Sequence, residues 1–247
     1  MTASRFGAGA ILLGTLCILS ACVGHTPRTP PATSAPPSLT APYAAAARNG
    51  ARVYRLDPTN SAVRVLVDKA GPLSGLGHRH VITVGGLRGF AVTGPNGKGE
   101  ADLRFPVTDL VVDPRAAASI YPDFSPPSRE DVTGTRRHML GPVLDSSRYP
   151  RVSLHLQGSI APSAPPLKAA IALHGVRRSM EIGGKFSEQG SRLTAEGEFS
   201  LSQSDFNITP YSVMMGALRV KDSLRIRYHL TFKAWCPAPS PAKVSTC

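Results

Sequence analysis

The sequence predicts an all-β fold, an antiparallel barrel of eight or nine strands with one short helix. The clearest observation is the segment from Ser223 to Lys233, in which polar and apolar residues alternate without interruption, as on a strand with one buried face. The segment 193–202 repeats this alternation, so the two segments predict a hairpin. Twenty-three prolines and twenty-three glycines among short apolar runs favour strands and turns over helices.

Nine segments carry strand signals. They are 52–57, 61–68, 79–93, 99–112, 151–160, 167–174, 179–187, 192–203 and 222–233. Ser128 begins the one convincing helical pattern, because a serine at this position can cap a helix N-terminus. This many alternating strands without intervening helices favour a closed or nearly closed antiparallel barrel, which removes exposed strand edges. A β-sandwich is the alternative.

The N-terminus predicts export. An apolar run over 6–19 follows Arg5 and is too short to span a bilayer comfortably, which is typical of a secretory signal. The following Leu19-Ser20-Ala21-Cys22 resembles the bacterial lipobox and predicts cleavage before Cys22 and acylation of that cysteine. A signal cleaved elsewhere is the alternative. Because Val23 and not aspartate comes next, we expect an outer-membrane lipoprotein on the periplasmic side.

Composition divides the remainder of the chain. After the signal peptide 1–21, residues 22–50 are rich in Pro, Ala, Ser and Thr and predict a disordered tether. The barrel domain is expected over 51–235, and a Pro-rich tail over 236–247 contains Cys236 and Cys247. An oxidising compartment allows these two cysteines to pair, and free thiols are the alternative.

The charge favours anionic partners but not nucleic acid. The formal net charge is +12. Removal of the signal peptide, which contains one basic and no acidic residue, leaves +11. The basic residues are scattered over polar strand faces without an aromatic ladder, so we expect no nucleic-acid partner. A solvated basic surface accounts for the pattern.

Five short motifs follow one another along the domain. They are Tyr54-Arg55-Leu56-Asp57-Pro58 with Ser61-Ala62-Val63, Tyr149-Pro150-Arg151-Val152, Leu173-His174-Gly175-Val176-Arg177-Arg178, Ser204-Asp205-Phe206-Asn207-Ile208 and Val220-Lys221-Asp222. Together, from Tyr54 to Phe232, they resemble the YceI-like family of periplasmic lipid-binding proteins. The resemblance implies a lipocalin-type barrel that holds an isoprenoid or similar amphiphile. Gln203 and Asn207 stand where the family often has Arg and Gly, which removes an Arg that could contact a headgroup.

Alternation along the strands predicts which side chains point into the barrel. The predicted lining comprises Val65, Phe90, Leu103, Phe105, Leu154, Leu156, Ile171, Phe199, Ile226 and Tyr228. A slender ligand that buries about ten methylenes there would gain roughly 8 kcal/mol before the costs of association. The alternative is that these side chains meet each other and fill the barrel, which then binds nothing.

Two histidines carry a different hypothesis. His78 and His80 lie two residues apart, so on a strand they would face the same way and could chelate a metal or approach a haem. Candidate third ligands are His138, His155 and His174. A metal- or haem-binding redox accessory is therefore the alternative function, and structural histidines in a Gly-rich turn are the simpler interpretation.

No motif of catalysis is found in the sequence. It contains no Gly-x-Ser-x-Gly elbow, phosphate loop or His-Glu-x-x-His helix, and the paired carboxylates Asp109 and Asp113 fit polar strand faces. We therefore expect a non-catalytic protein without a cofactor. Its expected partners are a lipophilic small molecule and, through the lipid anchor, a membrane. Nothing in the sequence indicates an oligomeric state.

Overall fold

The structure is a computed structural model that describes residues 38–121, 124–161 and 164–238. The signal peptide, Cys22 and residues 22–37 of the expected tether lie outside the described residues. Cys236 is disulfide-bonded, and its expected partner Cys247 also lies outside them. Within the described residues no helix is both long and apolar enough to cross a membrane.

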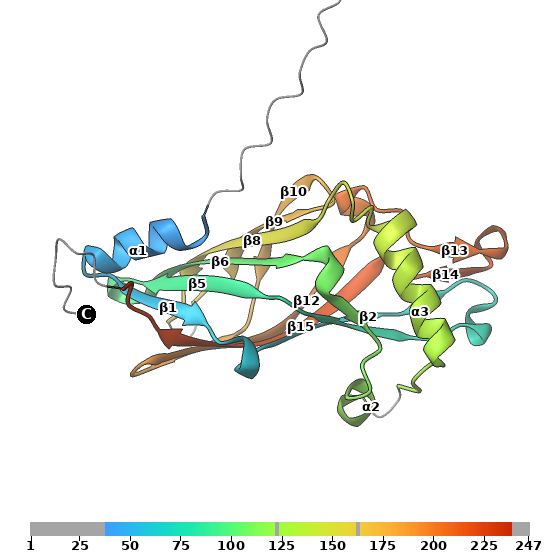
Figure 1. The fold of residues 1–247 in the computed structure, drawn as a ribbon, viewed down its shortest axis with the longest axis horizontal. Coiled ribbons are helices and arrows are strands. Elements are labelled where there is room, and N and C mark those ends of the chain that lie inside the picture. Colours follow the sequence, from blue (N-terminus) through green and yellow to red (C-terminus); the bar gives the residue numbers. More distant parts are fainter. Residues whose placement is uncertain (1–37, 122–123, 162–163, 239–247) are drawn as a thin grey trace, which may run out of the picture. The chain divides into compact units, whose positions relative to one another are not determined.

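Twelve strands form one antiparallel sheet, and three short strands form a second (Figure 1). The main sheet comprises β1 (Arg52–Leu56), β2 (Ala62–Val67), β4 (His80–Val84), β5 (Arg88–Thr93), β6 (Lys98–Pro106), β7 (Leu110–Val112), β8 (Arg151–Ser159), β9 (Leu167–Leu173), β10 (Val176–Ile182), β11 (Lys185–Gln189), β12 (Arg192–Ser202) and β15 (Ser223–Ala234). The small sheet comprises β3 (Lys69–Ala70), β13 (Ser212–Val213) and β14 (Leu218–Val220). The predicted all-β antiparallel fold is confirmed. The expected eight or nine strands become twelve because turns divide three predicted segments, 79–93, 99–112 and 179–187.

The expectation of a single short helix is wrong. The α-helices are α1 (Thr40–Arg48), α2 (Ala117–Ile120) and α3 (Arg129–His138). Single turns are η1 (Pro58–Asn60), η2 (Ser74–Leu76), η3 (Pro95–Gly97), η4 (Val107–Asp109), the π-helical η5 (Met139–Val143), η6 (Ser204–Phe206) and η7 (Met214–Gly216). The predicted helix is α3, and its N-cap is confirmed because the Ser128 hydroxyl accepts a hydrogen bond from Asp131 N at 3.1 Å.

Helix α1 corrects the expected tether and the expected start of the domain. Residues 40–48 fall within the expected disordered tether, but their alanines favour a helix and one aromatic side chain fixes this helix to the sheet. Tyr43 is buried, and its ring stacks on Phe90 with centroids 5.3 Å apart. Its hydroxyl donates to Asp102 Oδ2 at 3.0 Å. The folded unit therefore begins near Ser38.

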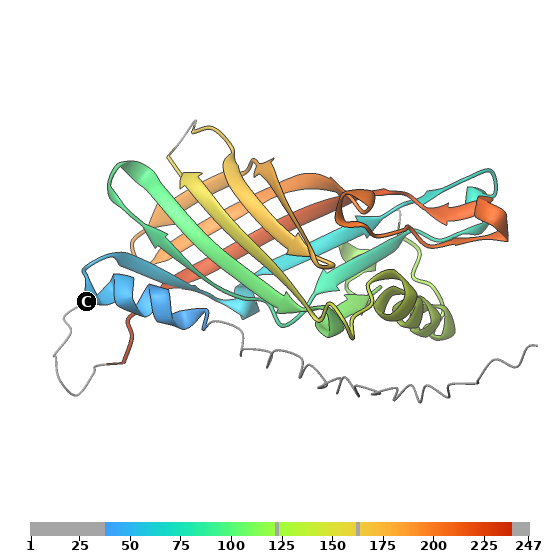
Figure 2. The ribbon, with the colours of Figure 1, turned by 90° about the horizontal axis from the view of Figure 1, so that it is seen from above.

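Strand β15 is the centre of the sheet. It pairs with β12 from Arg192 opposite Lys233 to Ser202 opposite Ser223, which confirms the predicted hairpin. Its other edge pairs with β2 and then with β1. From β1 the sheet continues through β5, β6, β8 and β9 to β10, and from β2 it continues through β4 to β7. The strands thus wrap around one core (Figure 2).

Side chains complete the barrel between β10 and β12, because no ladder joins these two strands in the described part of the chain. Ile182, Phe206 and Ile208 are buried together at this seam. The Tyr228 hydroxyl crosses it and donates to Gly183 O at 2.8 Å. Gly197 leaves room for this contact, since a Cβ there would lie 2.6 Å from the hydroxyl.

The two ends of the barrel differ. Helix α1 lies beside β1 and β5 at one end, and α3 lies at the other end with the small sheet projecting beyond it (Figures 1 and 2). Arg136 of α3 donates to the carbonyl of Thr108 at 2.6 Å, which fixes the helix against the turn before β7.

Candidate functional site

The barrel encloses a cavity of about 1000 Å³. Most strands of the main sheet contribute side chains to its wall, among them β2, β4, β5, β6, β8, β9, β12 and β15. The register explains this wall, because Ala101 lies opposite Leu156 and Leu103 opposite Leu154, on the same face of neighbouring strands. The barrel is therefore hollow, and the alternative of a filled barrel does not hold.

Nine of the ten predicted lining residues line this cavity. They are Val65, Leu103, Phe105, Leu154, Leu156, Ile171, Phe199, Ile226 and Tyr228. Their position is confirmed, while their contact with a lipid stays a prediction.

The inward orientation predicted for Phe90 is wrong. Phe90 lies outside the cavity in a cluster with Tyr43, Val53 and Trp235, and its ring centroid is 4.9 Å from that of Trp235. The prediction treats 79–93 as one strand, but a turn at 85–87 separates β4 from β5. This turn shifts the phase by one residue, so that Ala91 lines the cavity and Phe90 points outward.

Polar side chains surround the cavity at the α3 end. The polar rim comprises His78, His80, Arg129, Asp131, His138 and Tyr211, all of which line the cavity. The Ser128 hydroxyl donates to Asp131 Oδ2 at 2.7 Å, and this hydrogen bond is the main reason that the pKa of Asp131 is lowered. The electrostatic interaction with His78 and His80 lowers the pKa of Asp131 further. The site thus combines an apolar body with a polar end, as an amphiphile requires.

His80 is the most firmly oriented group of the rim. Its Nδ1 lies 2.6 Å from Asp113 Oδ2, and Asp113 Oδ1 accepts from Val81 N at 2.7 Å. Asp113, expected on a polar strand face, is buried and has a positive φ of 47°. Since Nδ1 is occupied, Nε2 of His80 is the ring nitrogen that a ligand can use.

The two histidines do not share a strand as expected. Strand β4 begins at His80, so His78 lies in the loop before it, although both line the cavity. Of the candidate third ligands, His138 lines the cavity, and its ring centroid lies 4.9 Å from that of Tyr211. His174 is bonded through Nδ1 to Phe206 O at 3.2 Å. A metal or haem at His78 and His80 stays a prediction.

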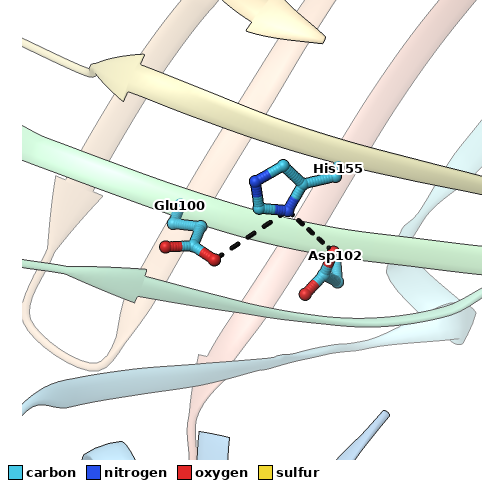
Figure 3. Close-up of side chains that lie close together, drawn as sticks. All are labelled: Glu100, Asp102 and His155. Atoms are coloured by element: carbon cyan, nitrogen blue, oxygen red, sulfur yellow. Dashed lines mark hydrogen bonds and ion pairs between the residues drawn. The ribbon is translucent and has the colours of Figure 1, made fainter. Parts of the chain in front are cut away.

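One group of three metal-ligand side chains converges in the described ranges, and it lies elsewhere (Figure 3). Glu100 and Asp102 lie on β6 and His155 lies on β8; Asp102 and His155 do not line the cavity, whereas Glu100 does. His155 Nδ1 is 3.0 Å from Asp102 Oδ1 and 3.8 Å from Glu100 Oε1. Because Tyr43 donates to the second oxygen of Asp102, both oxygens of this carboxylate have partners without a metal. Burial, and next the charge of Asp102, raise the pKa of Tyr43.

The family motifs meet at the seam. The ring of Tyr149 packs on that of His174, with centroids 4.4 Å apart, and a Cβ at Gly175 would lie 2.6 Å from the Tyr149 ring. His174 and Gly175 have φ values of 51° and 76°, which close the tight β9–β10 turn. With the bond from His174 to Phe206 O, three motifs distant in sequence contact each other. They stabilise the barrel.

The departures from the family pattern are accommodated locally. Gln203 lines the cavity, but its Nε2 donates to Lys221 O at 3.0 Å, so its amide holds the start of β15. Asp222 accepts from Ser204 N at 2.9 Å and from its hydroxyl at 2.7 Å. Asn207 takes the left-handed conformation at φ 56°, as Asn tolerates.

This geometry defines a class, the antiparallel β-barrels with an internal apolar cavity and a polar rim at one end. The chain belongs to the YceI-like family. The family's YceI-like domain model matches residues 54–232, which is more than half of the chain and confirms the resemblance found in the sequence.

Solved structures show the same fold. The crystal structure of Burkholderia cenocepacia BcnA gives a TM-score of 0.53 at 14% identity and covers 71% of this chain and 98% of that chain. A polyisoprenoid binding domain from Saccharophagus degradans, implicated in plant cell wall breakdown, gives a TM-score of 0.51 at 13% identity, with 74% and 98% covered. At such identity the likeness shows the fold alone. No curated protein matches the sequence.

Proposed function

We propose that the protein is an exported lipoprotein that binds an isoprenoid or another lipophilic chain in the barrel cavity without converting it. The observation that carries the proposal is the cavity of about 1000 Å³ with its apolar wall. Membership of the YceI-like family supports it, as does the polyisoprenoid binding of the Saccharophagus degradans domain with the same fold.

The arrangement assigns separate roles to wall and rim. The hydrocarbon chain lies along the wall, where apolar burial supplies the affinity. The head of the ligand lies at the polar rim, where Nε2 of His80 and the Asp131 carboxylate offer hydrogen bonds. No chemical step and no cofactor is assigned, since these groups hold and orient the ligand.

Export and anchoring rest on the lipobox. Acylation of Cys22 would keep the barrel on the periplasmic side of a bacterial membrane, and Val23 favours the outer one. Incorporation of labelled palmitate into the wild-type chain and its loss in Cys22→Ala would support the anchor. Equal incorporation in both would contradict it.

The experiment that tests the binding function is native mass spectrometry of the protein purified from the periplasmic side, with organic extraction and elemental analysis. One extractable isoprenoid or acyl species per chain is expected. An empty protein would contradict the proposal. A stoichiometric metal or haem that disappears in the His78→Ala, His80→Ala double variant would replace it by the redox accessory.

A further inference from the structure

Four large apolar side chains are exposed together on the loops of the small sheet. Leu73 and Leu76 lie between β3 and β4, and Met214 and Met215 lie between β13 and β14. Leu76 is 69% exposed, Met214 63%, and Met215 completely. We call these four residues the apolar tip. Single exposed apolar side chains are ordinary on a protein surface, but a cluster of this kind marks a contact with a partner.

The tip is held by a hydrogen-bonded frame. Strand β3 pairs with β14, and Leu73 N donates to Ala217 O at 2.9 Å, which joins the two loops. Met214 and Met215 each have a φ of 53°, a left-handed conformation that is unfavourable for residues with a Cβ. The fold therefore keeps these side chains exposed at the expense of backbone strain.

The charge around the tip fits an anionic surface. The loops 68–80 and 209–222 contain four basic and two acidic residues. Lys69, Arg219 and Lys221 are exposed, and across the described ranges no carboxylate lies within ion-pair distance of them. Asp68 is bonded to Arg79 at 2.7 Å and does not neutralise them. Basic residues beside exposed apolar side chains are typical of surfaces that bind anionic lipid.

The tip adjoins the cavity. Three residues next to the tip line the cavity: His78 lies in the loop between β3 and β4, Tyr211 directly precedes β13, and Val220 lies on β14. The chain between Cys22 and the folded unit is also long enough for the tip to meet the membrane that holds the anchor. Ser38 lies sixteen positions after Cys22, enough for up to about 55 Å, whereas the 12 residues of β15 span about 40 Å. A chain anchored at Cys22 can thus place its tip on the same membrane.

We propose that the apolar tip docks on anionic phospholipid, inserting its four side chains at the interface, and so brings the polar rim to the bilayer for ligand exchange. The docking depends on the surface of the apolar tip and not on what the cavity binds. Only the exchange of ligand rests on the proposed function.

Oxidation of methionine by dilute hydrogen peroxide reports on the tip directly. The full chain is oxidised with and without vesicles of phosphatidylethanolamine and phosphatidylglycerol, and each methionine is followed by peptide mass spectrometry. Oxidation of Met214 and Met215 should fall about tenfold if roughly nine tenths of the protein is docked. Met180, half-buried on β10, should be unchanged.

Leu76→Asp leaves both methionines in place and should remove most of this protection, and added salt should weaken it. Ile120→Asp, which alters a side chain 41% exposed on α2, is the matched control and should retain protection. Because both variants carry the same N-terminal anchor, the anchor cannot account for a difference between them.

Three results would overturn docking on anionic lipid. They are no protection, equal protection by vesicles of phosphatidylcholine alone, and protection without vesicles that rises with protein concentration, which would assign the tip to a second copy of the chain. Isoprenoid binding in vesicle-free solution separates the two proposals. Leu76→Asp should bind as the wild type does, so lost docking with retained binding leaves the proposed function intact.

Discussion

Affinity for the cavity should rise with the length of an isoprenoid chain and then stop rising. A carbon of a hydrocarbon chain takes up roughly the 30 Å³ of a water molecule in the liquid. The cavity of about 1000 Å³ therefore holds about 30 carbons, or about six isoprene units. Each unit should add roughly 1.5 to 4 kcal/mol, since a buried carbon contributes between about 0.3 and about 0.8 kcal/mol.

Competition against a fluorescent fatty acid measures this dependence. A series of prenols of increasing length displaces the probe from the delipidated protein, and Kd is obtained for each. Kd should fall about tenfold or more per isoprene unit and become constant beyond about six units. A Kd independent of chain length, or one that still falls far beyond the cavity volume, would refute the assignment of the chain to the cavity.

Substitutions at Asp57, Tyr43 and Gly197 test the scaffold. Lys233 holds the pKa of Asp57 at about 2, below its ordinary 3.8, so the stability gained from this pair is complete above about pH 4 and is lost as pH falls toward 2. In Asp57→Asn the free energy of unfolding, measured by urea titration, should fall less than in the wild type as pH falls from about 4 toward 2. An equal fall in both proteins would contradict this. Tyr43→Phe should lower the free energy of unfolding by about 1 kcal/mol and Tyr43→Ala by about 3 to 5 kcal/mol. Equal losses in the two variants would show that the ring of Tyr43 does not anchor α1. Gly197→Ala should lower Tm, and adding Tyr228→Phe should restore part of it.

Long alternating segments made most of the barrel predictable. In β12 and β15 the side chains alternate over ten or more residues, so that face and register follow from the sequence. The error at Phe90 has a local cause, because a three-residue turn shifts the phase without an obvious break in the apolar pattern. The sequence does not reveal helix α1, because a segment with one buried aromatic side chain resembles a disordered linker in composition.

The rim and the tip could not be predicted for other reasons. His80 and Asp113 are 33 residues apart, and their contact requires a positive φ at an aspartate. Strands β3, β13 and β14 are only two or three residues long and show no periodicity. Their position depends on tertiary hydrogen bonds, and the exposed Leu76 and Met215 gain significance only when the two loops are seen to meet.

Blocking the cavity tests the central claim most directly. Ala101 lines the cavity, whereas Ser187 is exposed and does not line it, so Ala101→Trp fills the interior and Ser187→Trp adds the same side chain outside. We predict that Ala101→Trp keeps the fold by circular dichroism but binds prenol at least tenfold more weakly, while Ser187→Trp binds as the wild type does. Equal binding by both folded variants would contradict the cavity as the lipid site.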